Sequence, residues 1–462
     1  MKLKDDKIQI SLKRDIDLWE AIIYGVGVIL GAGIYALIGK VVGYAGNASW
    51  LAFLIAAIVG LLTGLSYCEL SSKFPEAGAE YVWIDRTFNR KIFSFVVGWI
   101  LIFSEIFSVC TVAIGFGGYL TGLLNLEIYN LMPVIFGLIL IGILTVINFA
   151  GIQESANVNI IFTIIEAGGL IFIISLGITS LGNVNYLNLM GGWTMIGISN
   201  LISSIAIIFF AFVGFEDMAN ISEETKNPRK TIPKALLISL MICTILYILV
   251  SLTTVSMIAA NPSLSLANFA ASAEPLAYLF EGIPAAAIAM SIIALFATAN
   301  TVLVMLIVTS RMVYGLSDEN AFPDIFKKIY KKTDTPWVAI IFVTILSASF
   351  IFLQQIQLLA EATVFMIFLI FGIVNITLIV LRYKQRNQER KKGEFRIPIN
   401  FKWFPIIPLI GAFTCFFMLF NYWKPENWII LPINIILIIV GIIIYFIFTW
   451  INKKEQKNDI GE

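Results

Sequence analysis

The sequence predicts an all-α polytopic membrane protein with twelve transmembrane helices, and two observations carry that prediction. The chain of 462 residues is 59% hydrophobic and only 13% charged, and its mean hydropathy is +0.90. A soluble chain of this length could not bury so much apolar surface. The apolar residues also fall into twelve stretches that are each long enough to span the hydrocarbon core. The expected spans are 19–44, 47–70, 92–122, 131–150, 156–180, 196–219, 233–259, 286–316, 337–354, 359–381, 402–421 and 428–450.

Lys and Arg are distributed unevenly over the connections between these spans. Apart from Lys40 and Lys424, all of them fall in alternate connections or in the two tails. Because basic connections stay on the cytoplasmic side, this asymmetry places both tails, 1–18 and 451–462, in the cytoplasm of a cell whose plasma membrane holds the protein. The basic stretch 382–396 is explained by this topology and by anionic lipid, so no nucleic-acid partner is expected.

The first span contains five glycines between Gly25 and Gly39. Each glycine costs about 1 kcal/mol of helix propensity relative to alanine. Irregular backbone at membrane depth is tolerated only where it faces protein or a watery cavity. The stretch therefore favours a helix that breaks near Gly31-Ala32-Gly33, with freed amides and carbonyls that bind a ligand. The alternative is a close helix–helix contact, for which membrane proteins also use small residues.

The sixth span has an anomaly of its own at Phe209–Asp217, five helices after the first. Paired anomalies in corresponding spans are typical of an inverted-repeat transporter with a site at the membrane midplane. The spans then divide into a five-helix repeat at 19–180 and an inverted five-helix repeat at 196–381. We assign the two remaining helices, at 402–450, to packing or dimer contacts, so the protein is expected to be a monomer or a homodimer.

Four motifs in this order resemble the amino acid–polyamine–organocation (APC) superfamily. The first is the glycine-rich stretch, and the others lie at Phe74–Trp83, Phe210–Pro233 and Thr309–Leu316. The resemblance covers at least the first ten spans. It implies the leucine-transporter fold and the transport of amino acids or related amines.

The resemblance also implies a substrate site made mainly of backbone groups at the two helix breaks. The amides of Ala32 and Gly33 would hold the substrate carboxylate, helped by the positive end of a half-helix. The carbonyl of Ile29 would accept from the substrate ammonium group. The carbonyls that complete the ammonium cage are those of Phe210, Ala211 and Val213. The ring of Phe210 would close over the site, although core packing also explains an aromatic ring there.

Ionisable residues inside spans are costly and usually functional, and Glu166 in the fifth span is the most informative. The resemblance places it where many relatives carry a lysine, seven residues after Asn159. Three interpretations remain open. In the first, Glu166 carries a proton, because a buried acid can take and release one. In the second, an ionised Glu166 binds sodium with Thr309, Ser310 and carbonyls of the first span, because oxygen ligands suit a hard cation. In the third, a neutral Glu166 makes a structural hydrogen bond.

Two further acids have two interpretations each. Glu216 follows the break in the sixth span, where the resemblance makes it a gating or coupling carboxylate. The alternative is a cap on the second half-helix, whose N-terminal end favours a negative group. Glu105 in the third span is either a helix–helix hydrogen-bonding group or a group that acts in transport.

These features predict a secondary active transporter that imports an amino acid by alternating access, with proton coupling. The alternatives are an exchanger without ion coupling, a sodium-coupled symporter and, from a different class, a membrane sensor of amino acids. The sequence has no histidine and no nucleophile–base motif, so an enzyme is not expected. It has no Gly-x-x-x-x-Gly-Lys-Ser/Thr loop, which excludes an ATP-driven pump. No cofactor and no resident metal are expected, only a coupling ion, H⁺ in preference to Na⁺.

Overall fold

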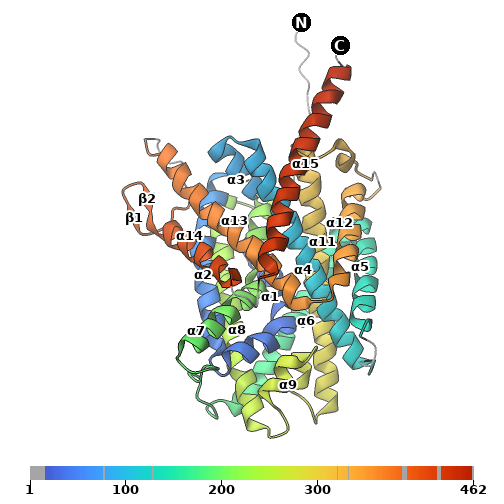
Figure 1. The fold of residues 1–462 in the computed structure, drawn as a ribbon, viewed down its shortest axis with the longest axis vertical. Coiled ribbons are helices and arrows are strands. Elements are labelled where there is room, and N and C mark those ends of the chain that lie inside the picture. Colours follow the sequence, from blue (N-terminus) through green and yellow to red (C-terminus); the bar gives the residue numbers. More distant parts are fainter. Residues whose placement is uncertain are drawn as a thin grey trace.

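The structure, a computed structural model, describes residues 16–75, 79–126, 130–319, 321–330, 332–387, 393–423 and 428–459, without side chains at 152–157, 223–224 and 451–459. In these ranges the chain forms a bundle of long helices (Figure 1). Within the described ranges, eleven helical segments are long and apolar enough to cross a membrane, and a shorter apolar helix lies at Trp337–Leu353, where the ninth span is expected. Each of the twelve predicted spans therefore coincides with an apolar helix.

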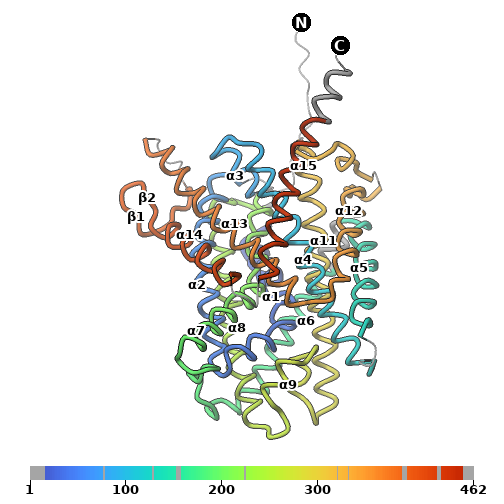
Figure 2. The backbone as a smooth tube through the Cα atoms, viewed as in Figure 1, coloured from blue at the N-terminus to red at the C-terminus, as the bar shows by residue number. Residues whose placement is uncertain are grey.

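The path of the chain through these helices can be followed in Figure 2. The long helices are α1 (Leu18–Ala45), α2 (Ser49–Lys73), α4 (Lys91–Leu123), α5 (Met132–Ala150), α6 (Ile152–Gly177), α7 (Met195–Ile208), α8 (Pro228–Ala260), α11 (Pro284–Asp318), α12 (Trp337–Phe350), α13 (Ile356–Lys384), α14 (Ile406–Leu419) and α15 (Ile430–Asp459). The short helices are α3 (Ala79–Phe88), α9 (Leu266–Ala271) and α10 (Pro275–Tyr278). The 3₁₀ turns are η1 (Ile178–Ser180), η2 (Phe209–Phe212), η3 (Phe215–Glu224), η4 (Asp324–Lys327), η5 (Ile351–Leu353) and η6 (Phe420–Trp423).

The start of the eleventh span differs from the prediction. A hairpin of β1 (Asn400–Phe401) and β2 (Phe404–Pro405) precedes it, with Phe401 paired to Phe404. Lys402 turns the chain with a φ of 58°. The helix therefore begins at Ile406 and not at residue 402. Hydropathy alone missed the hairpin, because its aromatic residues continue the apolar run of the span.

Helix α1 lies inside the bundle and carries the first predicted break. It packs against α6, α7, α8 and α11, and every residue from Gly27 to Tyr35 is buried. By contrast, α5, α6 and α15 expose apolar side chains such as Ile143, Ile164 and Phe446. Exposed apolar belts on the outer helices are the surface that a bilayer covers. The interior position of α1 is what allows irregular backbone at this depth.

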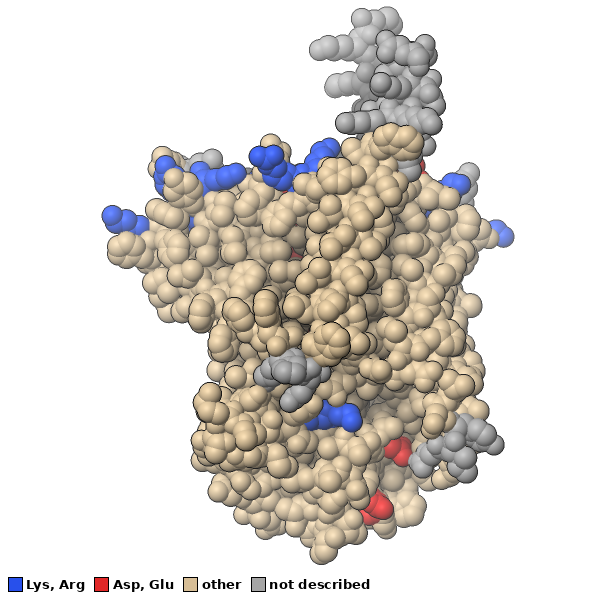
Figure 3. Space-filling model, in the orientation of Figure 1, with Lys and Arg blue, Asp and Glu red and all other residues tan. Residues whose placement is uncertain are grey.

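Basic side chains gather at one end of the molecule, beside the ends of α3 and α13 (Figure 3). There, the guanidinium of Arg382 in α13 forms a buried ion pair with Glu69 near the end of α2. The Nε of Arg382 donates to Oε1 of Glu69 at 2.8 Å, and the amide of Ile397 donates to Oε2 of Glu69 at 2.9 Å. The carboxylate of Glu69 therefore links the ends of α2 and α13 to each other and to the chain at Ile397, which follows α13.

Candidate functional site

The predicted break in α1 is present at Gly31, whose φ is 20° and ψ is 171°. A positive φ is readily adopted only by glycine. In a continuous helix the amide of Ala32 would donate to the carbonyl of Val28. It donates instead to the hydroxyl of Thr301 in α11, at 2.8 Å. The amide of Ala32, one of the two amides predicted to hold a carboxylate, therefore already donates a hydrogen bond to an oxygen atom of the protein itself.

The second predicted break follows α7. The helix ends at Ile208 and continues as the 3₁₀ turn η2, and Gly214, with a φ of 114°, then separates η2 from η3. A Cβ atom at position 214 would lie 3.0 Å from the carbonyl oxygen of Val28. The glycine thus serves both the left-handed backbone and the close approach of the two broken segments.

The two breaks are in direct contact through backbone atoms. A Cβ atom at Gly33 would lie 2.5 Å from the Cα of Ala211. The hydroxyl of Tyr247, from α8, lies 2.6 Å from the carbonyl of Ile29, 2.8 Å from that of Leu30 and 3.0 Å from that of Ala211. A tyrosine hydroxyl donates only one hydrogen. At any moment it leaves two of these three carbonyls able to accept from another donor.

The structure brings the residues predicted to bind substrate to one place, in a closed arrangement. Phe210 is 3% exposed, and its carbonyl accepts from the amide of Val213 at 3.2 Å. A cavity of about 10 Å³ lies beside the two breaks and is lined by Val213 among others. That volume is the room that one water molecule needs, so the cavity in this arrangement is too small for an amino acid.

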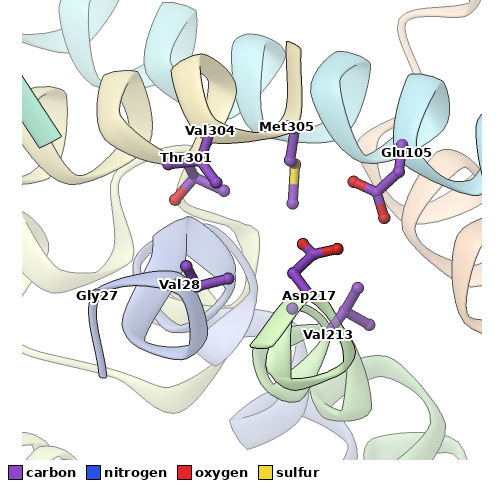
Figure 4. Close-up of a pocket in the computed structure, with 9 residues that line it drawn as sticks. Gly27, Val28, Glu105, Val213, Asp217, Thr301, Val304 and Met305 are labelled. Carbon is purple, nitrogen blue, oxygen red and sulfur yellow. The ribbon is translucent and has the colours of Figure 1, made fainter. Parts of the chain in front are cut away.

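The lining of this cavity comes from four segments (Figure 4). Gly27 and Val28 belong to α1, and Val213, Gly214 and Asp217 belong to the second break. Glu105 comes from α4, and Thr301, Val304 and Met305 come from α11. The cavity is therefore closed by both broken helices and by two helices that pack across them.

Glu166 lies in the interface between α6 and α11 and is completely buried. The hydroxyl of Tyr35, four residues after the break in α1, donates to the backbone carbonyl of Glu166 at 2.6 Å. Asn300 faces Glu166 from α11, and its Nδ2 donates to the hydroxyl of Thr163 at 3.3 Å. Among the described residues, neither carboxyl oxygen of Glu166 has a hydrogen-bond partner. The side chain of Asn300 nevertheless interacts with the Glu166 carboxyl group, so a structural hydrogen bond stays one of the interpretations of this residue.

Thr309 and Ser310, the predicted sodium ligands, do not reach Glu166. They lie about 14–15 Å beyond Asn300 along α11. The hydroxyl of Thr309 donates to the carbonyl of Met305 at 2.6 Å, and that of Ser310 donates to the carbonyl of Ile307 at 2.9 Å. The expected set of sodium ligands is therefore not assembled, because α6 and α11 pack with Thr163 opposite Asn300.

Glu216 and Glu105 occupy different positions around the second break. Glu216 is 2% exposed, and its Oε2 accepts from the amide of Gly214 at 2.9 Å, which is the capping contact that the sequence left open. Glu105 lines the cavity, and in the part of the chain that the structure describes its Oε2 has no hydrogen-bond partner.

Sequence reasoning missed the contacts of Thr301, Asn300 and Tyr247 with this region. A signal exists for the first two, because three polar residues stand within Ala297-Thr-Ala-Asn-Thr301 of an otherwise apolar span. A polar cluster in a membrane helix usually faces the protein interior. Tyr247 offers no such signal, because a single tyrosine in an apolar span can lie either in a protein core or at the membrane interface.

Two broken helices in contact inside a bundle of apolar spans define the class of secondary transporters with a midplane site. The chain belongs to the amino acid permease family, which matches residues 16–448. It is therefore an APC-superfamily membrane transport protein with the leucine-transporter fold, and not an enzyme.

Named relatives extend over most of the chain. The branched-chain amino acid permease BcaP of Bacillus subtilis is 28% identical, over 97% of this chain and 95% of that protein. The methylthioribose transporter of Bacillus subtilis is 27% identical, over 95% and 94%. Cationic amino acid transporter 4 of Mus musculus is 29% identical, over 83% of this chain and 62% of that protein.

Proposed function

We propose that the protein imports an amino acid across the plasma membrane by alternating access and couples this import to protons. The contact of Gly33 with Ala211 carries the proposal, because it joins the two broken helices at the place where backbone groups can hold an ammonium and a carboxylate group. The closed cavity beside it supports a cycle in which the breaks separate to admit substrate and close around it.

The substrate we propose is an amino acid with a small or neutral side chain. Backbone atoms at the breaks bind the α-amino and α-carboxyl groups in this proposal. The neighbouring side chains of Ile29, Phe210 and Val213 are apolar. Two of the relatives are branched-chain amino acid permeases, which agrees with an apolar side-chain site.

We further propose that the basic end of the molecule faces the cytoplasm. Lys and Arg gather at one end of the space-filling view (Figure 3), and short basic connections are retained on the cytoplasmic side of a membrane. This orientation places both tails in the cytoplasm.

Glu166 is the proton carrier in this proposal. Its carboxyl group is buried, no charged partner of the group is found among the described residues, and its backbone is tied to α1 through Tyr35. A charge that appears or disappears on a buried carboxyl group changes its solvation by several kcal/mol. Such a change is large enough to shift the equilibrium between two conformations of a transporter.

Reconstitution of the purified protein in liposomes tests the function. We expect uptake of labelled leucine or valine that rises when the liposome interior is made alkaline and falls when a proton ionophore is added. Uptake that requires an amino acid inside the liposomes, and ignores the pH gradient, identifies an exchanger instead. Binding without uptake identifies a sensor. The absence of both uptake and ligand-induced thermal stabilisation, for a panel of amino acids, contradicts the proposal.

A further inference from the structure

Two carboxylate groups enter the closed cavity from opposite sides. Asp217 follows the second break, in η3, and Glu105 comes from the middle of α4. In Figure 4 both carboxylates point into the gap beside Met305. The segments that carry them are more than 100 residues apart in the chain, so the fold creates this pairing.

Both groups are almost completely removed from solvent. Glu105 is 3% exposed and Asp217 is 5% exposed, and Oε2 of Glu105 has no hydrogen-bond partner within the described ranges. An ionised carboxylate buried in this way costs several kcal/mol unless a positive charge compensates it. The cavity therefore needs a cation or a proton.

The protein supplies no such charge at this place. The cavity lining contains no Lys or Arg among the residues that the structure describes, and the sequence has no histidine. The groups that interact electrostatically with Glu105 are all acidic: Asp217, Glu216 and Glu80. Among the described residues, the titratable side chain of Tyr67 also lies within the electrostatic range of Glu80, Glu216 and Asp217. The negative charge of this cluster is therefore balanced either by a bound cation or by protonation of the carboxyl groups.

Apart from the two acids, the polar side chain in the described lining is that of Thr301. Thr301 contributes a hydroxyl, and Val28 lies near the C-terminal end of the first half of α1, which favours a positive charge. Oxygen ligands suit a hard cation. Ca²⁺ and Mg²⁺ require six or more ligands, and no group of three or more acidic, His or Cys ligands is found within the described residues. The ligand set therefore suits a monovalent cation.

The size of the cavity further restricts which ligands can fit. About 10 Å³ holds one water molecule, and so it holds a bare cation or a protonated water but not the amine of an amino acid. We propose that Glu105 and Asp217 form a binding site for a small monovalent cation, which is either Na⁺ or a proton shared between the carboxylates through a water molecule. The site lies apart from Glu166 and uses neither Thr309 nor Ser310.

The position of the site suggests its role. It joins Val28 of the first broken helix to Asp217 of the second, so an occupied site holds the two breaks together, and its release favours their separation. The role in transport rests on the function proposed above, whereas the binding of a cation does not.

Melting of the purified full-length protein in nanodiscs tests the site. The melting temperature is measured in NaCl and in N-methylglucamine chloride at equal ionic strength and pH. If the cation is Na⁺, sodium stabilises the wild type by mass action. This stabilisation is lost in Glu105→Gln and in Asp217→Asn. A matched control is Glu361→Gln, because Glu361 is equally buried, on α13, outside the cavity, and it keeps the stabilisation.

If sodium has no effect, infrared difference spectra across a pH titration test the proton. The wild type and Glu361→Gln then share a protonated carboxyl band that both cavity variants lack, while the bands of other buried acids such as Glu166 remain in all of these proteins. Met305→Phe, which fills the cavity and leaves both acids in place, removes the sodium effect or shifts this signal. The proposal is overturned if the sodium effect survives in both acid variants, or if sodium has no effect and no protonated carboxyl band of the wild type is lost in both acid variants. Stabilisation by leucine is recorded in parallel, so a failure of the proposed transport function is seen separately.

Discussion

Gly33 and Ala211 touch through their backbones: a Cβ atom at position 33 would lie 2.5 Å from the Cα of Ala211. Only hydrogen fits in that space, so the two broken helices can close together only when residue 33 is glycine. The contact shows that close packing and a helix break, which the sequence presents as alternatives, are both present at this stretch.

Replacement of Gly33 by valine is expected to abolish substrate uptake and ligand-induced thermal stabilisation. The backbone of Ala211 cannot move aside as a flexible side chain can, so the valine side chain occupies the space between the breaks and prevents them from closing around a substrate, at a cost of about 1–3 kcal/mol. Uptake into liposomes and the shift in melting temperature measure the effect. The control is Gly142→Val, since Gly142 lies on the exposed side of α5 with nothing within 4 Å. Wild-type binding by Gly33→Val would show that the space between Gly33 and Ala211 is not part of the substrate site.

Tyr247→Phe is expected to lower the melting temperature of the unliganded protein. Loss of the hydroxyl leaves the carbonyls of Ile29, Leu30 and Ala211 without the donor they share, at a cost of about 1–3 kcal/mol. The ammonium group of a bound amino acid replaces that donor, so stabilisation by substrate becomes larger than in the wild type. Tyr422→Phe is the matched control, because Tyr422 is fully buried and its hydroxyl has no partner in the described part of the chain. An unchanged substrate effect in Tyr247→Phe would argue against an ammonium site at these carbonyls.

Glu166→Gln is expected to reduce uptake driven by a pH gradient to background while exchange of internal for external substrate continues. Glutamine has the shape of the protonated acid but cannot release a proton. Uptake with imposed proton gradients and, separately, sodium gradients measures the effect, with Glu361→Gln as a buried-acid control. Full gradient-driven uptake by Glu166→Gln would exclude Glu166 from both proton and sodium coupling.

The buried carboxyl group of Glu80, in α3 outside the spans, is expected to make the stability of the folded protein depend on pH. Burial raises the pKa of its carboxyl group above the usual value, which is about 4.3 in an unfolded chain. Between these two pKa values the folded protein holds a proton that the unfolded chain has lost, so this group makes stability fall as pH rises through that window. Glu80→Gln removes this contribution, and its stability relative to the wild type rises with pH.

Melting temperatures of both proteins at increasing pH, from about pH 4 upward, test this dependence on Glu80. Asp85→Asn, on the same helix, controls for the loss of an acidic side chain. A difference between Glu80→Gln and the wild type that stays constant with pH would contradict the assigned cause.

The spans and both breaks are predictable from the sequence because each depends only on a single stretch of the chain, through the length of its apolar run or its glycine residues. Gly31 and Gly214 adopt positive φ values at or beside the predicted positions. The hairpin before Ile406 was not predicted, because its turn at Lys402 interrupts no apolar pattern.

The partners of the candidate site could not be derived in the same way. Their contacts depend on the register between helices distant in sequence, as when Thr163 meets Asn300. A motif places Thr309 and Ser310 on the correct helix, yet it cannot say which turn of α11 faces Glu166. The pairing of Glu105 with Asp217 likewise appears only when α4 crosses the second break.

The central claim is that substrate binds at the two breaks through backbone groups. A cryo-electron microscopy structure with a transported amino acid bound tests it most directly. We expect the carboxylate to lie at the amides of Ala32 and Gly33, with the Thr301 hydroxyl displaced from Ala32, and the ammonium to lie at the carbonyls of Ile29 and Ala211. An amino acid bound elsewhere, with the contact between Gly33 and Ala211 still closed, would contradict it.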